Sequence, residues 1–176
     1  MLLDRLFRPR PALAAGQGLY GLAVEQSRKP ELYIALGAPD TVEGRFEIYS
    51  LHVVLLLDRL RGHSELATDV SQVIFDTYAK GLDNALREMG VGDLSVGRKM
   101  RKLGEAFYGR CKSYEKAFAA LPEEAPLRAL LERTVYAEAD TAPVVLLISY
   151  LLGQRAALAG QPIERLLAGT VEWAPR

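Results

Sequence analysis

The sequence predicts an all-α protein, a compact bundle of about seven helices arranged around one long central core helix. Apolar residues recur three and four positions apart through most of the chain, which is the period of an α-helix. No segment alternates cleanly between apolar and polar residues, so strands are not expected. The 176 residues are 49% hydrophobic, which is enough for one domain to bury a core.

The chain is expected to begin with a mobile arm. Residues 1–10 hold leucines and a phenylalanine beside three arginines. The arm could therefore place a short amphipathic turn in a membrane interface, or it could pack onto the domain or be disordered. One helical domain is expected over residues 11–176, because no repeat or low-complexity tract divides them.

Two helices are expected before the core helix, over residues 12–28 and 30–36. Pro30 ends the first, because proline cannot continue a helix, and Gly37 with Pro39 ends the second. Three glycines in the first segment weaken its helical propensity without excluding a helix.

The core helix is predicted over residues 41–61. Asp40 and Glu43 stand three residues apart, as the two polar residues of a capping box do. Two apolar stripes follow at helical spacing, and they consist of Val42, Phe46, Tyr49, Val53, Leu56 and Leu60, with Ile48, Leu51 and Leu55 beside them. A helix that is apolar on two faces lies in the middle of a domain.

Five further helices are expected, over residues 65–89, 95–120, 126–138, 142–159 and 162–168. Ser64 is placed to cap the first of them. The face that this helix buries should carry Phe75, Tyr78, Leu82, Leu86 and Met89. The face that the next helix buries should carry Met100, Leu103, Phe107, Cys111, Tyr114, Phe118 and Leu121.

A glycine-rich corner joins the helices at 65–89 and 95–120. Gly90 and Gly92 suit the left-handed backbone that ends a helix, where a Cβ atom is penalised. Asp93 or Ser95 is then placed to accept the free N–H groups of the next helix. Corners of this kind usually have a structural role, which is to connect two helices.

The charges balance overall but are unevenly distributed. The chain has 22 lysines and arginines and 22 acidic residues, so its formal net charge is zero. This argues against a dedicated nucleic-acid-binding protein, and in particular against DNA as a partner. Residues 98–116 nevertheless hold seven cations and two acids. The candidate basic surface is Arg98, Lys99, Arg101 and Lys102. Such asymmetry favours an oriented encounter with a charged partner, although a solvated helix face gives the same pattern.

Compartment signals are sparse. The single cysteine, Cys111, cannot form an internal disulfide, which favours a reducing compartment. The longest apolar stretch, residues 142–152, is shorter than the roughly 20 residues that span a bilayer, and the start has no apolar run of signal-peptide length. The chain is therefore expected to be soluble or peripheral to a membrane.

The residues contain no recognisable catalytic constellation, so the chain is not expected to be an enzyme and no cofactor or metal is expected. The string at residues 16–21 matches a dinucleotide fingerprint but lacks the preceding strand. Cys111 lies on an apolar stripe, which favours a buried residue over a nucleophile. His52 is expected to be a hydrogen-bonded core histidine, with haem ligation as the alternative.

Several charged and aromatic residues are candidates for binding a partner. Arg45 opposes the dipole in the first turn of the core helix, so it needs an internal carboxylate or belongs to a binding surface. Tyrosine and arginine near residues 108–114 are types favoured at interfaces. The candidate partner-binding set is Arg45, Phe46, Arg87, Glu88, Asp93, Tyr108, Arg110 and Tyr114.

Four blocks of sequence resemble the ubiquinol–cytochrome c chaperone family. They are residues 26–30 with Tyr33, residues 37–47 followed by 51–52 and 58–60, the corner at 86–96, and residues 107–110 with Tyr114. The blocks lie in order and cover roughly residues 20 to 120, so the resemblance says nothing of the C-terminal third.

The resemblance implies a bacterial relative of a mitochondrial factor that assembles respiratory complex III. It implies a non-enzymatic chaperone for the cytochrome bc1 complex that binds newly made cytochrome b. The surplus of apolar stripes adds the hypothesis that an apolar groove binds an amphipathic segment of this client as a helix. The resemblance further implies a place in the bacterial cytoplasm at the inner membrane. From the charge pattern we expect the basic stretch of residues 98–116 to face ribosomal RNA or anionic lipid. The alternatives are a small-molecule carrier, with haem held by His52, and a generic helical interaction module. The oligomeric state is left open.

Overall fold

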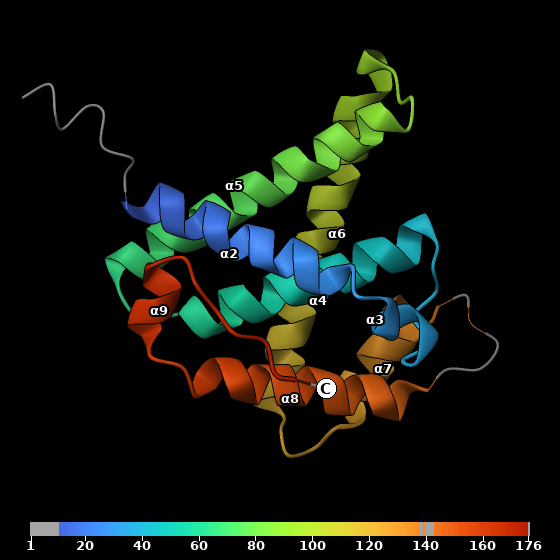
Figure 1. Ribbon diagram of the computed structural model, residues 1–176. Coiled ribbons are helices and arrows are strands. Elements are labelled where there is room, and N and C mark those ends of the chain that lie inside the picture. The colour runs from blue at the N-terminus through green and yellow to red at the C-terminus, as the bar shows by residue number, and fades with distance from the viewer. Residues whose placement is uncertain (1–10, 138, 140–142, 176) are drawn as a thin grey trace, which may run out of the picture.

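A computed structural model describes residues 11–137, 139 and 143–175. In these residues all regular structure is helical, which confirms the predicted all-α fold (Figure 1). The expected N-terminal arm, residues 1–10, lies outside the described residues.

The helices follow the predicted order, with ends shifted by at most four residues. They are α2 (Pro11–Ser27), α3 (Pro30–Ile34), α4 (Val42–Leu60), α5 (Glu65–Glu88), α6 (Asp93–Ala119), α7 (Ala125–Thr134), α8 (Val144–Ala159) and α9 (Ile163–Leu167). The largest shift is at the end of α7, because residues 135–137 of the predicted helix are not helical. The predicted helix ends at residues 138 and 142 lie outside the described residues.

The central position of α4 is confirmed. It packs against α2, α5, α6 and α8, and it runs through the middle of the molecule (Figure 1). Both predicted stripes are buried along most of its length, including Ile48, Leu51 and Leu56. Val42 is the exception, with 58% of its surface exposed, because it occupies the first turn of the helix at the edge of the core.

The start of α4 differs from the predicted capping box. Thr41, rather than Asp40, is the N-cap, and its Oγ1 accepts a hydrogen bond from the Gly44 N–H at 3.1 Å. A Cβ atom on Gly44 would lie 2.0 Å from the carbonyl oxygen of Pro39. The chain before α4 therefore folds tightly over the first turn, and only glycine fits there.

The predicted buried face of α5 is partly wrong. Phe75 and Met89 are 36% and 53% exposed, whereas the buried side chains are Ala67, Val70, Ile74, Tyr78 and Leu86. The reason is that α5 packs along α2, whose position selects one of two apolar faces on α5. On α6 the predicted residues Phe107, Tyr114 and Phe118 are buried. The others, Met100, Leu103 and Cys111 of α6 and Leu121 just after it, are only partly covered.

The helices α5 and α6 form a hairpin whose tip stands clear of the body (Figure 1). The two helices meet at the glycine corner of residues 89–92. Because the first turns of α6 lie in this projecting part, they have fewer apolar neighbours, and Leu94 is 99% exposed.

The last described residues run without regular structure between α2 and α8. The indole Nε1 of Trp173 donates to the Leu22 carbonyl at 3.2 Å. The Gln154 side chain accepts from the Ala174 N–H at 2.8 Å and donates to its carbonyl at 3.2 Å. We call residues 171–175 the C-terminal strap, because these bonds tie it across the bundle.

Candidate functional site

Of the two glycines expected to adopt the left-handed conformation at the corner, only Gly90 does so. Gly90 has a φ of +81°, the left-handed conformation that ends a helix. Gly92 has a φ of −67° and is the N-cap of α6, without a side-chain hydrogen bond. The expectation that Asp93 or Ser95 caps α6 is therefore wrong.

Asp93 is instead held by Arg87 across the corner. The Arg87 guanidinium donates to Asp83 at 2.7 Å on its own helix and also pairs with Asp93. These bonds raise the pKa of Arg87 above its ordinary value. The arginine thus links the end of α5 to the start of α6, and the neighbouring Glu88 is exposed at the same tip.

Arg45 has the internal carboxylate that its position required. Its Nε lies 2.5 Å from Oδ1 of Asp40, and both side chains are more than half exposed. The hydrogen bond from Arg45 lowers the pKa of Asp40. Phe46 is half-buried and packs against the core. This part of the candidate set lies at the start of α4, apart from the hairpin tip (Figure 1).

Arg110 and Tyr114 face inwards from α6. The Arg110 guanidinium forms a bidentate ion pair with Glu47 of α4, with Nε–Oε2 and Nη2–Oε1 distances of 2.8 and 2.6 Å. The hydrogen bond with Glu47 raises the pKa of Arg110 above its ordinary value. Tyr114 is 1% exposed. Both residues therefore hold α6 in the bundle.

Tyr108 and the candidate basic surface lie on the outside of α6. Tyr108 is 62% exposed, and the Lys112 ammonium stands 4.6 Å from the centre of its ring. The four basic residues, Arg98, Lys99, Arg101 and Lys102, are all exposed. The structure thus divides the candidate partner-binding residues among four places, namely the start of α4, the hairpin tip and the inner and outer faces of α6, and does not join them into one surface.

His52 is a satisfied core histidine, as predicted. Its Nδ1 lies 2.8 Å from the Ile48 carbonyl, which can only accept, so Nδ1 carries the proton. Its Nε2 then accepts from the Tyr150 hydroxyl at 2.8 Å, and that hydroxyl accepts from Gln26 at 2.9 Å. Burial lowers the pKa of His52 to about 4. Both ring nitrogens are engaged, so neither is free for a haem iron.

Cys111 is half-buried beside the core on α6. Burial raises the pKa of its thiol to about 11, so the thiol is protonated at neutral pH. A nucleophilic cysteine needs the opposite shift. Among the described residues no group of three or more histidine, cysteine or acidic side chains is placed to hold a metal ion.

One pocket lies where the end of α2, the short α3 and α8 meet. Its volume is about 280 Å³, and Leu32, Leu36 and Tyr150 supply its apolar lining, with Gln26 and Lys29 among its polar residues. We call it the α3–α8 pocket. Tyr150 links it to the buried histidine, because its hydroxyl bonds His52.

Two large exposed aliphatic side chains lie one helical turn from residues that line the α3–α8 pocket. Ile34 lies one helical turn after Pro30, a lining residue, and is 84% exposed. Leu146 lies one turn before Tyr150 on α8 and is 49% exposed. The two helices that line the pocket, α3 and α8, therefore also carry exposed apolar side chains.

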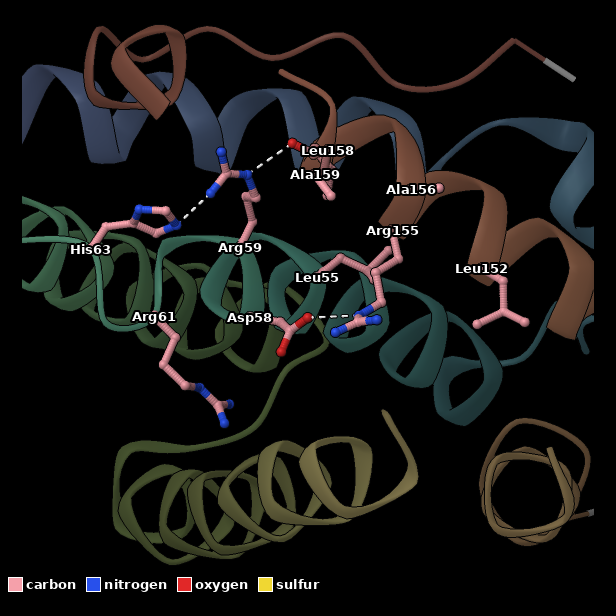
Figure 2. A pocket seen from close by; sticks show the side chains of 10 residues that line it. All are labelled: Leu55, Asp58, Arg59, Arg61, His63, Leu152, Arg155, Ala156, Leu158 and Ala159. Atoms are coloured by element: carbon pink, nitrogen blue, oxygen red, sulfur yellow. Dashed lines mark hydrogen bonds and ion pairs between the residues drawn. The ribbon is translucent and has the colours of Figure 1, made fainter. Parts of the chain in front are cut away.

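A second pocket, of about 300 Å³, lies between the ends of α4 and α8 (Figure 2). Arg59 donates to the Leu158 and Gln161 carbonyls, each at 2.9 Å, and so satisfies the end of α8. Arg155 pairs with Asp58 at 2.9 Å. Figure 2 shows Arg59 reaching Leu158 near the end of α8 and Arg155 meeting Asp58 of α4.

The third arginine of this pocket, Arg61, points away from the other two (Figure 2). Its Nη1 lies 2.5 Å from Glu115 of α6. The three arginines thus join α4, α6 and α8. Because each guanidinium group already has protein partners, we assign the pocket no ligand.

Sequence reasoning missed Tyr150, Gln154 and Trp173. Tyr150 and His52 are 98 residues apart, and no local period connects them. The apolar surroundings of Tyr150 in the sequence were the available signal, since a buried tyrosine usually finds a hydrogen-bond partner.

The sequence matches the family described as Ubiquinol-cytochrome C chaperone over residues 35–173. It is 26% identical over 160 residues to mouse (Mus musculus) ubiquinol-cytochrome c reductase complex assembly factor 1, covering 89% of this chain and 54% of that protein. The protein of the same name from Xenopus laevis is 24% identical over 162 residues, covering 89% of this chain and 79% of that one. The chain thus spans about half the length of the mouse relative.

A solved structure agrees with the fold. The crystal structure of the Cbp3 homolog from Brucella abortus superposes with a TM-score of 0.87 at 33% identity, covering 99% of this chain and 97% of that chain. The family match covers most of the chain, and the structural match covers nearly all of it. On these grounds the chain belongs to the ubiquinol-cytochrome C chaperone family.

Proposed function

We propose that this protein is a non-enzymatic assembly chaperone for the cytochrome bc1 complex, and that its client is newly made cytochrome b. The family match over residues 35–173 is the observation that carries the proposal. The relatives are named as assembly factors of the ubiquinol-cytochrome c reductase complex. Cytochrome b as the client is implied by the sequence blocks that resemble the family. We expect the protein in the bacterial cytoplasm.

The α3–α8 pocket is our proposed client site. An amphipathic segment binds by burying its apolar face, and it needs a hollow bordered by exposed apolar residues. We assign that border to Ile34 and Leu146, because each is exposed and lies one helical turn from a lining residue. Leu32 and Tyr150 line the pocket itself. Lys29 and Glu31 provide polar groups for the edges of the segment. A volume of about 280 Å³ suits a few side chains of a peptide.

Deletion of the gene tests the assembly role. We expect deletion of the gene to lower both b-type haem absorbance and ubiquinol–cytochrome c reductase activity in membranes, while other respiratory complexes persist. Normal values of both in the deletion strain would contradict the assembly role.

The same strain tests the client site. We expect the double variant Ile34→Glu with Leu146→Glu to fail in complementation, because charges in the rim oppose burial of an apolar segment. Leu66→Glu is the matched control, since Leu66 is 37% exposed near the start of α5, away from α3 (Figure 1). If the double variant complements fully, the pocket is not the client site although the assembly role stands.

Direct contact can be measured by photo-crosslinking during translation of cytochrome b. A photoreactive residue at position 146 should crosslink to the new chain, and one at position 66 should not. A third at position 88 tests the candidate residues of the hairpin tip, Arg87, Glu88 and Asp93. Crosslinks at 88 without any at 146 would move the client site to the tip.

A further inference from the structure

One face of α6 carries a continuous row of exposed residues opposite its buried face. Successive members of the row lie three or four residues apart, except for the adjacent pair Arg101 and Lys102, so the side chains share one broad side of the helix. The row, which we call the α6 outer stripe, consists of Leu94, Arg98, Arg101, Lys102, Glu105, Tyr108, Lys112 and Lys116, all exposed. At 1.5 Å per residue it is about 33 Å long.

The stripe is strongly cationic and little neutralised. It holds five cations and one acid, and that acid, Glu105, lies 3.8 Å from Arg101, with both side chains more than 70% exposed. Such an exposed pair contributes little binding energy and leaves both groups free to meet another partner. The rest of the protein is slightly acidic, because the whole chain has no net charge.

Two large side chains stand out from this charged row. Leu94 is 99% exposed near the tip of the hairpin, and Tyr108 is 62% exposed near the middle of α6. A leucine in full contact with water gains free energy from burial in an apolar medium. A tyrosine, which has an apolar ring and a polar hydroxyl, suits the boundary between lipid headgroups and acyl chains.

We propose that the α6 outer stripe docks this protein on an anionic lipid bilayer. In this arrangement the helix lies along the surface, its lysines and arginines meet lipid phosphates, Leu94 enters the acyl boundary and Tyr108 lies among the headgroups. The proposal goes beyond the assembly role and does not depend on which client is bound. It uses no helix that crosses a membrane, and among the described residues none has the length and apolar character to do so.

Charge alone would equally fit ribosomal RNA, and Leu94 favours lipid. Phosphate contacts to RNA use cations and hydrogen-bond donors, so a fully exposed leucine at the tip would stay in water in such a complex. A bilayer takes up both the charges and the leucine.

Vesicle co-sedimentation tests the proposal with the full chain. We expect binding to phosphatidylcholine vesicles that contain phosphatidylglycerol, little binding to pure phosphatidylcholine, and a decrease with salt. Arg101→Glu with Lys102→Glu should weaken partitioning by about thirtyfold or more. Arg28→Glu with Arg133→Glu makes the same change in net charge at two exposed residues, one just after α2 and one in α7, and should bind as the wild type does.

The insertion of Leu94 is tested separately. Leu94→Ser should weaken partitioning by about tenfold, including at high salt where the electrostatic part is screened. Leu94→Trp should give a blue shift of fluorescence on anionic vesicles and quenching by brominated lipid. All substituted residues are exposed, so thermal unfolding should match the wild type.

Three outcomes would overturn the proposal. One is equal partitioning of the wild type and the Arg101→Glu, Lys102→Glu variant. Another is the absence of a blue shift and of quenching in Leu94→Trp. The third is that the charge variant loses binding to purified ribosomes but keeps its binding to vesicles, because the stripe would then serve RNA.

Discussion

At the scale of single residues, the buried polar groups join helices that are distant in the sequence. His52 connects α4 to α8 through Tyr150, and Glu47 connects α4 to α6 through Arg110. Each partner covers a group that would otherwise be buried without a hydrogen bond, at a cost of about 1–3 kcal/mol, or more for a charge. These residues therefore set the positions of the helices that carry the α3–α8 pocket and the α6 outer stripe.

His52 makes stability depend on pH. Its folded-state pKa of about 4 lies below its ordinary value of 6.5, so between these values the unfolded chain binds a proton that the folded protein does not. The free energy of unfolding should therefore fall as pH is lowered from 6.5 to 4, by up to about 3 kcal/mol from this residue. Urea unfolding at several pH values measures it. His52→Gln should show a shallower dependence, and identical slopes would contradict the prediction.

The ion pair between Arg110 and Glu47 should be sensitive to truncation. Arg110→Ala leaves the Glu47 carboxylate, which is 9% exposed, without its partner, and should lower the free energy of unfolding by about 3 kcal/mol. Arg101→Ala is the control, because it breaks a pair whose side chains are largely exposed. Denaturant unfolding gives both values. A loss as small as that of the control would mean that Glu47 is not effectively buried.

At the scale of elements, the C-terminal strap is held by hydrogen bonds to its backbone, in addition to the apolar contacts of Val171 and Trp173 with the core. Gln154 and Gln161 each accept from one strap N–H and donate to the carbonyl of the same residue, at Ala174 and Glu172 respectively. Trp173, between them, lies edge-on to His52 with 5.4 Å between ring centres. The strap thus covers the histidine network from outside.

Loss of the buried glutamine should loosen the strap. Gln154 is 2% exposed, so Gln154→Ala leaves two backbone groups of Ala174 without their partner and should cost about 1–3 kcal/mol. Gln161→Ala removes the equivalent bonds where water can replace them, and should cost less. Hydrogen exchange at the Ala174 amide, with denaturant unfolding, measures both variants. Equal protection in all three proteins would contradict the role given to Gln154.

At the scale of the whole molecule, one core joins the helices. Buried residues of α2, α4, α5, α6, α7 and α8 belong to a single apolar cluster. The single domain expected over residues 11–176 remains a prediction, which unfolding can test. Far-ultraviolet circular dichroism and the fluorescence of Trp173, the one tryptophan of the chain, should give the same denaturant midpoint. A fluorescence change at lower denaturant would mean that the strap unfolds first.

The comparison of sequence and structure shows where local patterns suffice. Ile48, Leu51 and Leu56 were predicted to be buried from their spacing, and they are. Phe75 was predicted to be buried and is 36% exposed, because α5 has apolar residues on more than one face and the spacing does not say which face meets α2. Tyr114 was a candidate for a partner surface, but its side chain lies in the core.

The sequence by itself determined the helices, their order, the corner at Gly90 and the central place of α4. These depend on the helical period and on caps, which act over three or four residues. Only the tertiary structure decided the His52–Tyr150 bond, the strap, the α3–α8 pocket and the exposure of Leu94. Each of these depends on which helix faces pack together, and that choice is made by contacts between residues far apart in the chain.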